Sequence, residues 1–166
     1  TSGSWRVAER LYASGTPLAT RPARRKAVSG ARRGAEPGSA RRERLAGQVV
    51  AAHDVAVAAA VRYLEDEACV VRRGRGGATR LQGGGLVSAA FRHRTSRAGD
   101  PQLHTHVLVA NVTFGADERW SALDGRAIYD TARTGGAVFQ AAMRRELTAA
   151  LSVEWGPVHE DAAEIA

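Results

Sequence analysis

Apolar residues recur at helical spacing between residues 42 and 68, where the sequence reads RERLAGQVVAAHDVAVAAAVRYLEDEA. Charged residues such as Asp54 and Arg62 fall elsewhere on the helical wheel, so the pattern predicts an amphipathic helix. The apolar face consists of Val50, Val57, Val61 and Leu64. His53 lies in the same helix, and we assign it no role because a single helical histidine is far more often a surface or core residue than a ligand.

A second helix is predicted over residues 125–151, GRAIYDTARTGGAVFQAAMRRELTAAL, with Asp124 as its N-cap. The adjacent Gly135 and Gly136 lower helix propensity, which predicts a kink or a close crossing at that point. The residues spaced for a buried face are Ile128, Ala132, Gly135, Phe139, Ala142, Met143 and Leu147.

Short apolar runs bounded by glycine predict strands between the two helices. The predicted strands are residues 69–73, 78–81, 85–94, 103–114 and 119–124. The last two are expected to pair across a turn-prone Gly-Ala-Asp. The glycine-rich RGRGGATRLQGGG reads as a hairpin connection, because it does not open a helix and lacks the Lys-Ser/Thr ending of a P-loop. The order helix, strands, helix predicts an α+β fold with a mainly antiparallel sheet and flanking helices.

Charge and turn residues set the N-terminal part apart. Glycine and proline interrupt residues 1–41, which we predict to be a basic, irregular segment, followed by a domain over residues 42–166. Residues 1–47 contain eleven Arg or Lys and three Glu, so they hold the whole net charge of +7. Such a segment attracts polyanions, of which nucleic acid is the commonest in a cytosol. An equally supported explanation is that arginine is abundant here because the coding DNA is GC-rich, in which case the segment is a solvated arm without a nucleic-acid partner.

Composition narrows the class of protein. The chain has 166 residues and 44% hydrophobic residues, enough to bury a core. No run of 18 apolar residues and no apolar signal-peptide core is present, so we expect a cytoplasmic protein without a membrane segment. Cys69 is the single cysteine, which excludes an internal disulfide and a cysteine-based zinc site. The start at Thr1 suggests a piece of a longer protein.

Three of the five histidines fall within residues 91–112, FRHRTSRAGDPQLHTHVLVANV. Residues two apart on a strand share a face, so His104 and His106 project together. If the preceding predicted strand is the antiparallel neighbour, the nine residues between Arg94 and His104 form the loop and His93 comes within reach. Three neutral imidazoles on one side of a cation leave its other positions for water or substrate. Spacing alone supports a metal site and a hydrogen-bonded polar cluster equally.

The chain from about Arg42 to the C-terminus resembles the histidine-motif region of TrwC-type conjugative relaxases, the MobF branch of the HUH endonucleases. The most specific string is SRAGDPQLHTH, residues 96–106. The resemblance implies a palm-like α+β relaxase core, here incomplete. In that family three histidines hold a divalent cation, so the resemblance implies that His93, His104 and His106 bind Mg²⁺ or Mn²⁺, with Zn²⁺ as an alternative.

The resemblance also implies a reaction and a partner. Family members nick one strand of plasmid DNA at the origin of transfer: a tyrosine attacks the scissile phosphorus, forms a 5′-phosphotyrosine and frees a 3′-hydroxyl that later rejoins the ends. The implied partners are single-stranded origin-of-transfer DNA and other relaxosome proteins. Arg92, Arg94 and Arg97 lie beside the histidines and are candidate DNA-binding residues, unless one or two of them pair with Asp100 or with carboxylates on the face of the sheet.

Two family features have no match in this sequence. None of the three tyrosines, Tyr12, Tyr63 and Tyr129, lies in the family's nucleophile motif, so the catalytic residue is unknown. A strand of the type Phe-Asp-Leu-Thr-Phe is expected after KAVSG (26–30), but ARRGAEPGSARRERL stands there. We therefore expect a relaxase part that is inactive alone. The alternatives are a degenerate fragment that binds metal and single-stranded DNA without cleavage, and an unrelated histidine-metal hydrolase.

Overall fold

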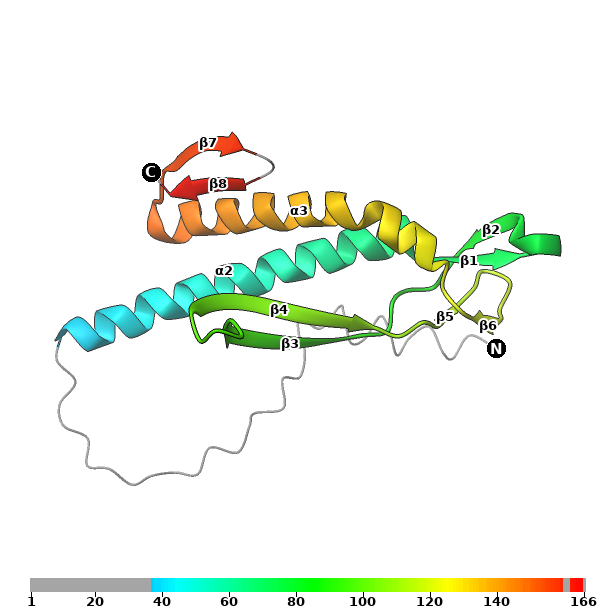
Figure 1. Ribbon diagram of the computed structural model, residues 1–166, viewed down its shortest axis with the longest axis horizontal. Helices are drawn as coiled ribbons and strands as arrows, with labels where there is room; N and C mark the ends of the chain where they lie inside the picture. The colour runs from blue at the N-terminus through cyan, green and yellow to red at the C-terminus, as the bar shows by residue number, and fades with distance from the viewer. Residues whose placement is uncertain (1–36, 160–161, 166) are drawn as a thin grey trace, which may run out of the picture. The chain divides into compact units, whose positions relative to one another are not determined.

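The computed structural model describes residues 37–159 and 162–165 (Figure 1), so residues 1–36 of the predicted irregular segment, which include the KAVSG stretch, lie outside the described residues. The described chain divides into two compact units. One contains residues 89–107, and the other contains residues 37–88 and the chain from residue 108 onward. The α+β prediction is confirmed, because two long helices accompany antiparallel strands.

The two helices lie side by side in one unit (Figure 1). α3 spans Gly125–Leu151, as predicted. α2 spans Pro37–Ala68 and so begins five residues before the predicted start. The helix extends beyond the amphipathic stretch through Arg41, Arg42 and Arg44, which are exposed and contribute no apolar face.

Small and aromatic residues bring the helices together. A Cβ on Gly135 would lie 3.3 Å from Leu64 Cδ2, so the predicted close crossing is confirmed, and α3 continues through it as one helix. His53 is buried, and its ring contacts Phe139 edge to face with 5.5 Å between ring centroids. It is therefore a core histidine. Ala132, predicted on the buried face of α3, is exposed.

Two short hairpins form a closed ring of strands in the same unit. β1 (Val70–Arg73) pairs antiparallel with β2 (Thr79–Gln82), and β5 (Thr113–Phe114) pairs antiparallel with β6 (Trp120–Ser121). Single bridges join the hairpins on both sides, Val71 to Leu123 and Gly83 to Gly115. We call these four strands the β ring. The predicted turn between the last two strands is confirmed, and a 3₁₀ turn at Arg75–Gly77 connects the first two.

The interior of the β ring is small and tightly packed. Cys69, Val71 and Thr113 have essentially no exposed surface. The Thr113 hydroxyl donates to the Gly85 carbonyl at 2.7 Å, so it can accept from the Cys69 thiol at 3.5 Å. A Cβ on Gly83 would lie 2.7 Å from Cys69 Sγ, closer than real contacts allow, so only glycine fits there. Cys69 is thus a buried free thiol.

The predicted long strand over residues 103–114 is wrong, because it divides into β4 (Pro101–Val109) and β5. Asn111 lies at the break, where its side-chain Oδ1 accepts the backbone N–H of Leu123 at 3.1 Å, a local side-chain hydrogen bond that competes with strand pairing. The described strands consequently form four two-stranded ribbons rather than one sheet. The fourth ribbon, β7 (Trp155–His159) with β8 (Ala162–Ile165), was not predicted.

Asp124 occupies the predicted N-cap position of α3, but its side chain makes no capping hydrogen bond. The carboxylate instead forms an ion pair with Arg80, 3.2 Å between Nε and Oδ2, and approaches Arg72 at 3.9 Å. The side chain is 4% exposed, and a buried carboxylate favours a guanidinium over a weak backbone dipole. The prediction of a capping side chain is therefore wrong.

α2 has the length and composition of a membrane-spanning helix, with 31 residues from Gly38 to Ala68 and a mean hydropathy of 1.2 in its most apolar window. Within that window 17% of residues are buried. The same helix carries Asp54, Arg62 and the buried His53, and charged or polar groups are costly in a bilayer. The absence of a membrane segment stays a prediction that these three residues favour.

Candidate metal centre

The candidate site lies on one β hairpin. β3 (Ser88–Thr95) pairs with β4, and residues 96–100 connect them. The connection is shorter than the nine residues predicted, because both strands extend farther toward the turn. Ser96 organises the turn: its N–H donates to the Asp100 carbonyl at 2.9 Å, and its hydroxyl accepts the N–H of Asp100 at 3.2 Å. Gly99 takes the left-handed conformation, with φ of 89°, that favours glycine.

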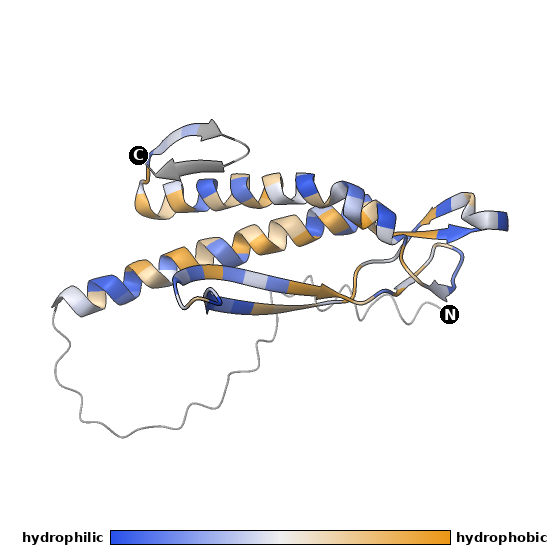
Figure 2. Cartoon of the chain, in the orientation of Figure 1, coloured by the Kyte–Doolittle hydropathy of each residue, from blue (hydrophilic) through white to orange (hydrophobic). Residues whose placement is uncertain are grey.

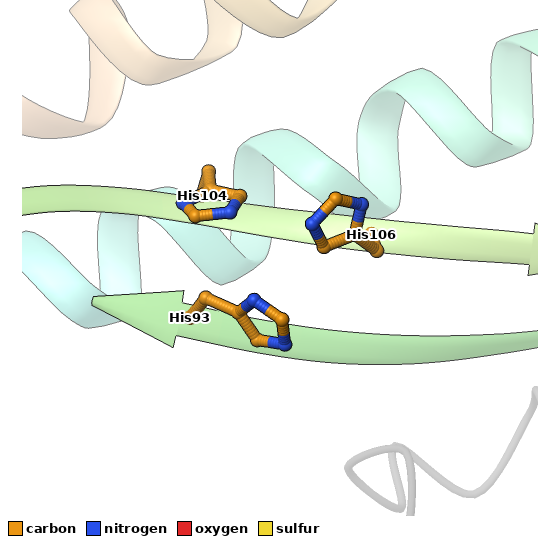
Figure 3. Close-up of side chains that lie close together, drawn as sticks. All are labelled: His93, His104 and His106. Carbon is orange, nitrogen blue, oxygen red and sulfur yellow. The ribbon is translucent and has the colours of Figure 1, made fainter. Parts of the chain in front are cut away.

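The three predicted histidines come together on this hairpin (Figure 3). His104 and His106 project from β4 on one face, and His93 projects toward them from β3. The centroid of the His93 ring lies 5.2 Å from the centroid of His104 and 4.9 Å from that of His106. The centroids of His104 and His106 are 5.0 Å apart. One nitrogen from each ring lies within 4.8 Å of the others. A short contact distance among three imidazole nitrogens is what a single metal ion requires.

A backbone carbonyl holds one of the rings. His104 Nδ1 lies 3.1 Å from the Gln102 carbonyl oxygen. A carbonyl only accepts, so Nδ1 must carry the proton and Nε2 keeps its lone pair for a ligand. Such a hydrogen bond from the non-ligating nitrogen is typical of metal-binding histidines. Sequence reasoning missed Gln102, because every residue has a carbonyl and only the fold shows which one faces the ring.

The donor set fits a divalent cation open to solvent. His104 is partly buried, whereas His93 and His106 are exposed, so the pocket among the rings is accessible from outside. Neutral imidazoles leave the charge of a bound cation intact, and three protein ligands leave positions for water or substrate. Among the residues that the structure describes, the three rings make a single hydrogen bond, which joins His104 to the Gln102 carbonyl. The hydrogen-bonded polar cluster is therefore the weaker interpretation.

The candidate DNA-binding arginines surround the histidines in sequence but not on one face. Arg92 and Arg94 flank His93 on β3, so strand alternation turns them to the opposite face of the hairpin. Arg97 lies in the turn after β3, and all three arginines are exposed. Asp100, their predicted ion-pair partner, contacts Ser96 instead, 3.5 Å between the side-chain oxygens.

The tyrosines that the structure describes lie on the helices. Tyr63 is partly buried in α2, and Tyr129 is exposed near the start of α3. Both belong to the unit that does not contain the histidines. Tyr12 lies outside the described residues.

Comparison with known proteins identifies a family whose model covers the described region. A family profile described as TrwC relaxase matches residues 37–166. The multifunctional conjugation protein TraI of Escherichia coli is 43% identical over 84 residues, which are 51% of this chain and 5% of that protein. TraI of Escherichia coli strain K12 is 40% identical over 84 residues. The chain therefore spans a small fraction of these relatives.

Solved structures of conjugative relaxase TrwC in complex with origin-of-transfer DNA have the same fold. A metal-free complex is 34% identical in sequence and has a TM-score of 0.66. The match covers 72% of this chain and 42% of the TrwC chain. A copper-bound complex has 34% identity, a TM-score of 0.65 and 40% of its own chain covered. A complex described as metal-bound is 35% identical, with a TM-score of 0.66.

Proposed function

This chain belongs to the TrwC relaxase family, and we propose that it is part of a conjugative relaxase that nicks and rejoins single-stranded DNA at an origin of transfer. The observation that carries the proposal is the cluster of three histidine nitrogens on one hairpin. The expected setting is the cytoplasm, with other relaxosome proteins as partners.

The proposed metal ligands are His93, His104 and His106, with Mg²⁺ or Mn²⁺ as the ion and Zn²⁺ as an alternative. When bound, the cation would stabilise the negative charge that builds on the non-bridging phosphate oxygens during strand transfer. The protein contributes the rigid β4 strand, which fixes two of the rings, and the Gln102 carbonyl, which fixes the tautomer of His104. Fixed ligands need no rearrangement when the phosphate arrives.

Strand transfer in the family's manner exchanges one phosphate ester for another. The oxygen of a tyrosine hydroxyl bonds to phosphorus, the bond to the 3′-oxygen breaks, and the hydroxyl proton is transferred to that oxygen. None of the three tyrosines lies in the family's nucleophile motif, so the catalytic residue of this chain is not assigned. This mismatch favours the second candidate function, a fragment that binds metal and single-stranded DNA without cleaving it.

Calorimetric titration of the full chain with Mn²⁺ tests the metal site. We expect one site in the wild type and none in the double variant His104→Ala with His106→Ala. Thr105→Ala is a matched control, because Thr105 lies between the two histidines and points to the opposite face of β4. Unchanged Mn²⁺ binding in the double variant would contradict the proposal.

DNA binding through Arg92, Arg94 and Arg97 predicts a strong dependence on salt. The logarithm of the binding constant for single-stranded DNA should fall with the logarithm of salt by about 0.7 per phosphate contacted. Replacing the three arginines with glutamine should reduce that slope. Binding that does not respond to salt would rule out this contact.

Cleavage distinguishes the two candidate functions. An end-labelled single-stranded origin-of-transfer oligonucleotide is incubated with the protein and Mn²⁺ or Mg²⁺. We expect no shortened product from this chain alone. A covalent protein–DNA adduct that disappears in Tyr12→Phe would show an active relaxase, and a shortened product without an adduct would indicate a hydrolase that activates water.

A further inference from the structure

The outer surface of the β ring combines an exposed tryptophan with unusually placed arginines. Trp120 is 64% exposed although it lies in a strand. Its ring packs on Phe114, with 5.4 Å between centroids and 59° between planes, so the indole is supported from one side. A large exposed aromatic ring held in place by a second ring is a suitable stacking surface.

Two arginines lie directly opposite each other on the neighbouring hairpin. Arg72 on β1 pairs in register with Arg80 on β2, an arrangement of like charges that destabilises a ribbon by itself. The buried carboxylate of Asp124 approaches both guanidinium groups. One carboxylate compensates one of the two positive charges, and the two side chains remain 50% and 55% exposed. The pair therefore presents a net positive charge and free N–H groups to solvent.

Strand alternation turns these groups away from the interior of the β ring. The Arg73 guanidinium points inward and donates to Ser121 Oγ at 2.7 Å. Successive residues of a strand point to opposite faces, so Arg72, next to Arg73, and Trp120, next to Ser121, point outward. The bridge between Val71 and Leu123 makes β1 and the chain leaving β6 adjacent. Positive charge and an aromatic face therefore both lie on the outside of the β ring, on neighbouring segments of the chain.

We propose that this outer surface, formed by Trp120, Arg72 and Arg80, is a contact site for single-stranded DNA separate from the histidine hairpin. Trp120 stacks on an unpaired base, and the arginines contact the adjacent phosphates. Unpaired bases offer aromatic faces for stacking, and guanidinium groups match phosphate oxygens. The inference rests on the proposed function for the identity of the ligand as DNA. A protein surface that packs on Trp120 is the competing occupant.

Fluorescence anisotropy of the full chain with a labelled 20-nucleotide oligo-dT tests the stacking. We expect Trp120→Ala to weaken binding roughly tenfold and Trp120→Phe to retain most of the affinity. Tyr129→Ala is the matched control, because Tyr129 is also an exposed aromatic, at 83%, and does not belong to the proposed contact site. Thermal unfolding of each variant verifies that the fold is intact.

An abasic oligonucleotide of the same length separates stacking from backbone contact. Trp120→Ala should bind it as the wild type does, whereas Arg72→Gln should reduce the salt slope by about 0.7 on either oligonucleotide. Equal losses on the abasic strand would overturn the stacking, as would unchanged oligo-dT binding in Trp120→Ala, the result expected if protein covers this residue. A wild-type chain that binds no single-stranded DNA would overturn the DNA-binding part of the proposed function itself, which distinguishes the two failures.

Discussion

In the β ring two charged side chains, Arg73 and Asp117, pair with each other, whereas in the histidine hairpin three imidazole rings form a cluster in which two of the three residues are exposed. Arg73 donates two hydrogen bonds to Asp117, at 2.6 and 3.0 Å, and thereby joins the two halves of the ring. This hydrogen bond lowers the pKa of Asp117 and raises the pKa of Arg73. The histidines of the hairpin, by comparison, keep their ring nitrogens directed toward one another.

The difference between the two regions also concerns burial. Cys69, Val71 and Thr113 fill the ring interior, while the hairpin exposes Phe91 and Leu108 on its histidine face. Figure 2 shows the loop end of the hairpin as strongly hydrophilic and the other end of β4 as hydrophobic. Packing determines which residues the ring tolerates, whereas the proposed metal ligation determines which residues the hairpin needs. Stability and binding should therefore respond to different substitutions.

The largest expected effect on stability is in the ring. Gly83→Val should lower the free energy of unfolding by about 3 kcal/mol, because the added side chain clashes with buried Cys69 and Thr113. Mn²⁺ affinity of the folded variant should stay within about twofold, because the histidines belong to the other unit. Urea unfolding and calorimetry measure the two quantities. A large loss of Mn²⁺ affinity in the folded variant would show that the regions are coupled.

Sequence reasoning predicted the features that depend on local periodicity. α3 has its predicted bounds because its apolar spacing is regular, and the alternation on β4 correctly placed His104 and His106 on one face. His93 was also placed correctly, because a hairpin is the simplest connection between neighbouring strands. The family resemblance and these strands were enough to locate the whole cluster.

The features that sequence reasoning missed depend on contacts between distant residues. At the break in the predicted strand, Asn111 accepts the N–H of Leu123, and the side chain of the N-cap residue Asp124 pairs with Arg80 instead of capping the helix. Trp155 donates to Thr148 Oγ1 at 2.8 Å and links the unpredicted last ribbon to α3. No local pattern carries such pairings.

A smaller effect is expected from two adjacent glycines of α3. Gly136→Ala should stabilise the protein by about 1 kcal/mol, because nothing lies near its added Cβ and alanine favours a helix. Gly135→Ala should gain less, because its Cβ meets Leu64 at 3.3 Å. The difference between the two unfolding free energies isolates the contact. Equal gains would mean that Leu64 moves aside without cost.

Removing the histidines should change stability less than either glycine. His104→Ala with His106→Ala, which is expected to abolish Mn²⁺ binding, should leave the unfolding free energy of the metal-free protein within about 0.5 kcal/mol, since neither ring is buried in the core. Thermal unfolding in a chelator measures this. A marked destabilisation would show that the imidazoles help to hold the hairpin and would weaken the contrast with the ring.

The smallest effect concerns two acids of the unit that contains the ring, whose pH responses should have opposite signs. Burial raises the pKa of Glu65 above its usual 4.5, against a hydrogen bond from the Leu86 amide, so its stabilising contribution is present below pH 4.5 and lost as pH rises through the folded pKa. Pairing lowers the pKa of Asp117 below its usual 3.8, so its stabilising contribution is present above pH 3.8 and lost as pH falls through the folded pKa. Melting temperatures of Glu65→Gln and Asp117→Asn across this range test both signs. Relative to the wild type, the melting temperature of Glu65→Gln should rise as pH rises toward neutrality, whereas that of Asp117→Asn should fall. Parallel trends would contradict the conclusion that burial governs Glu65 and pairing governs Asp117.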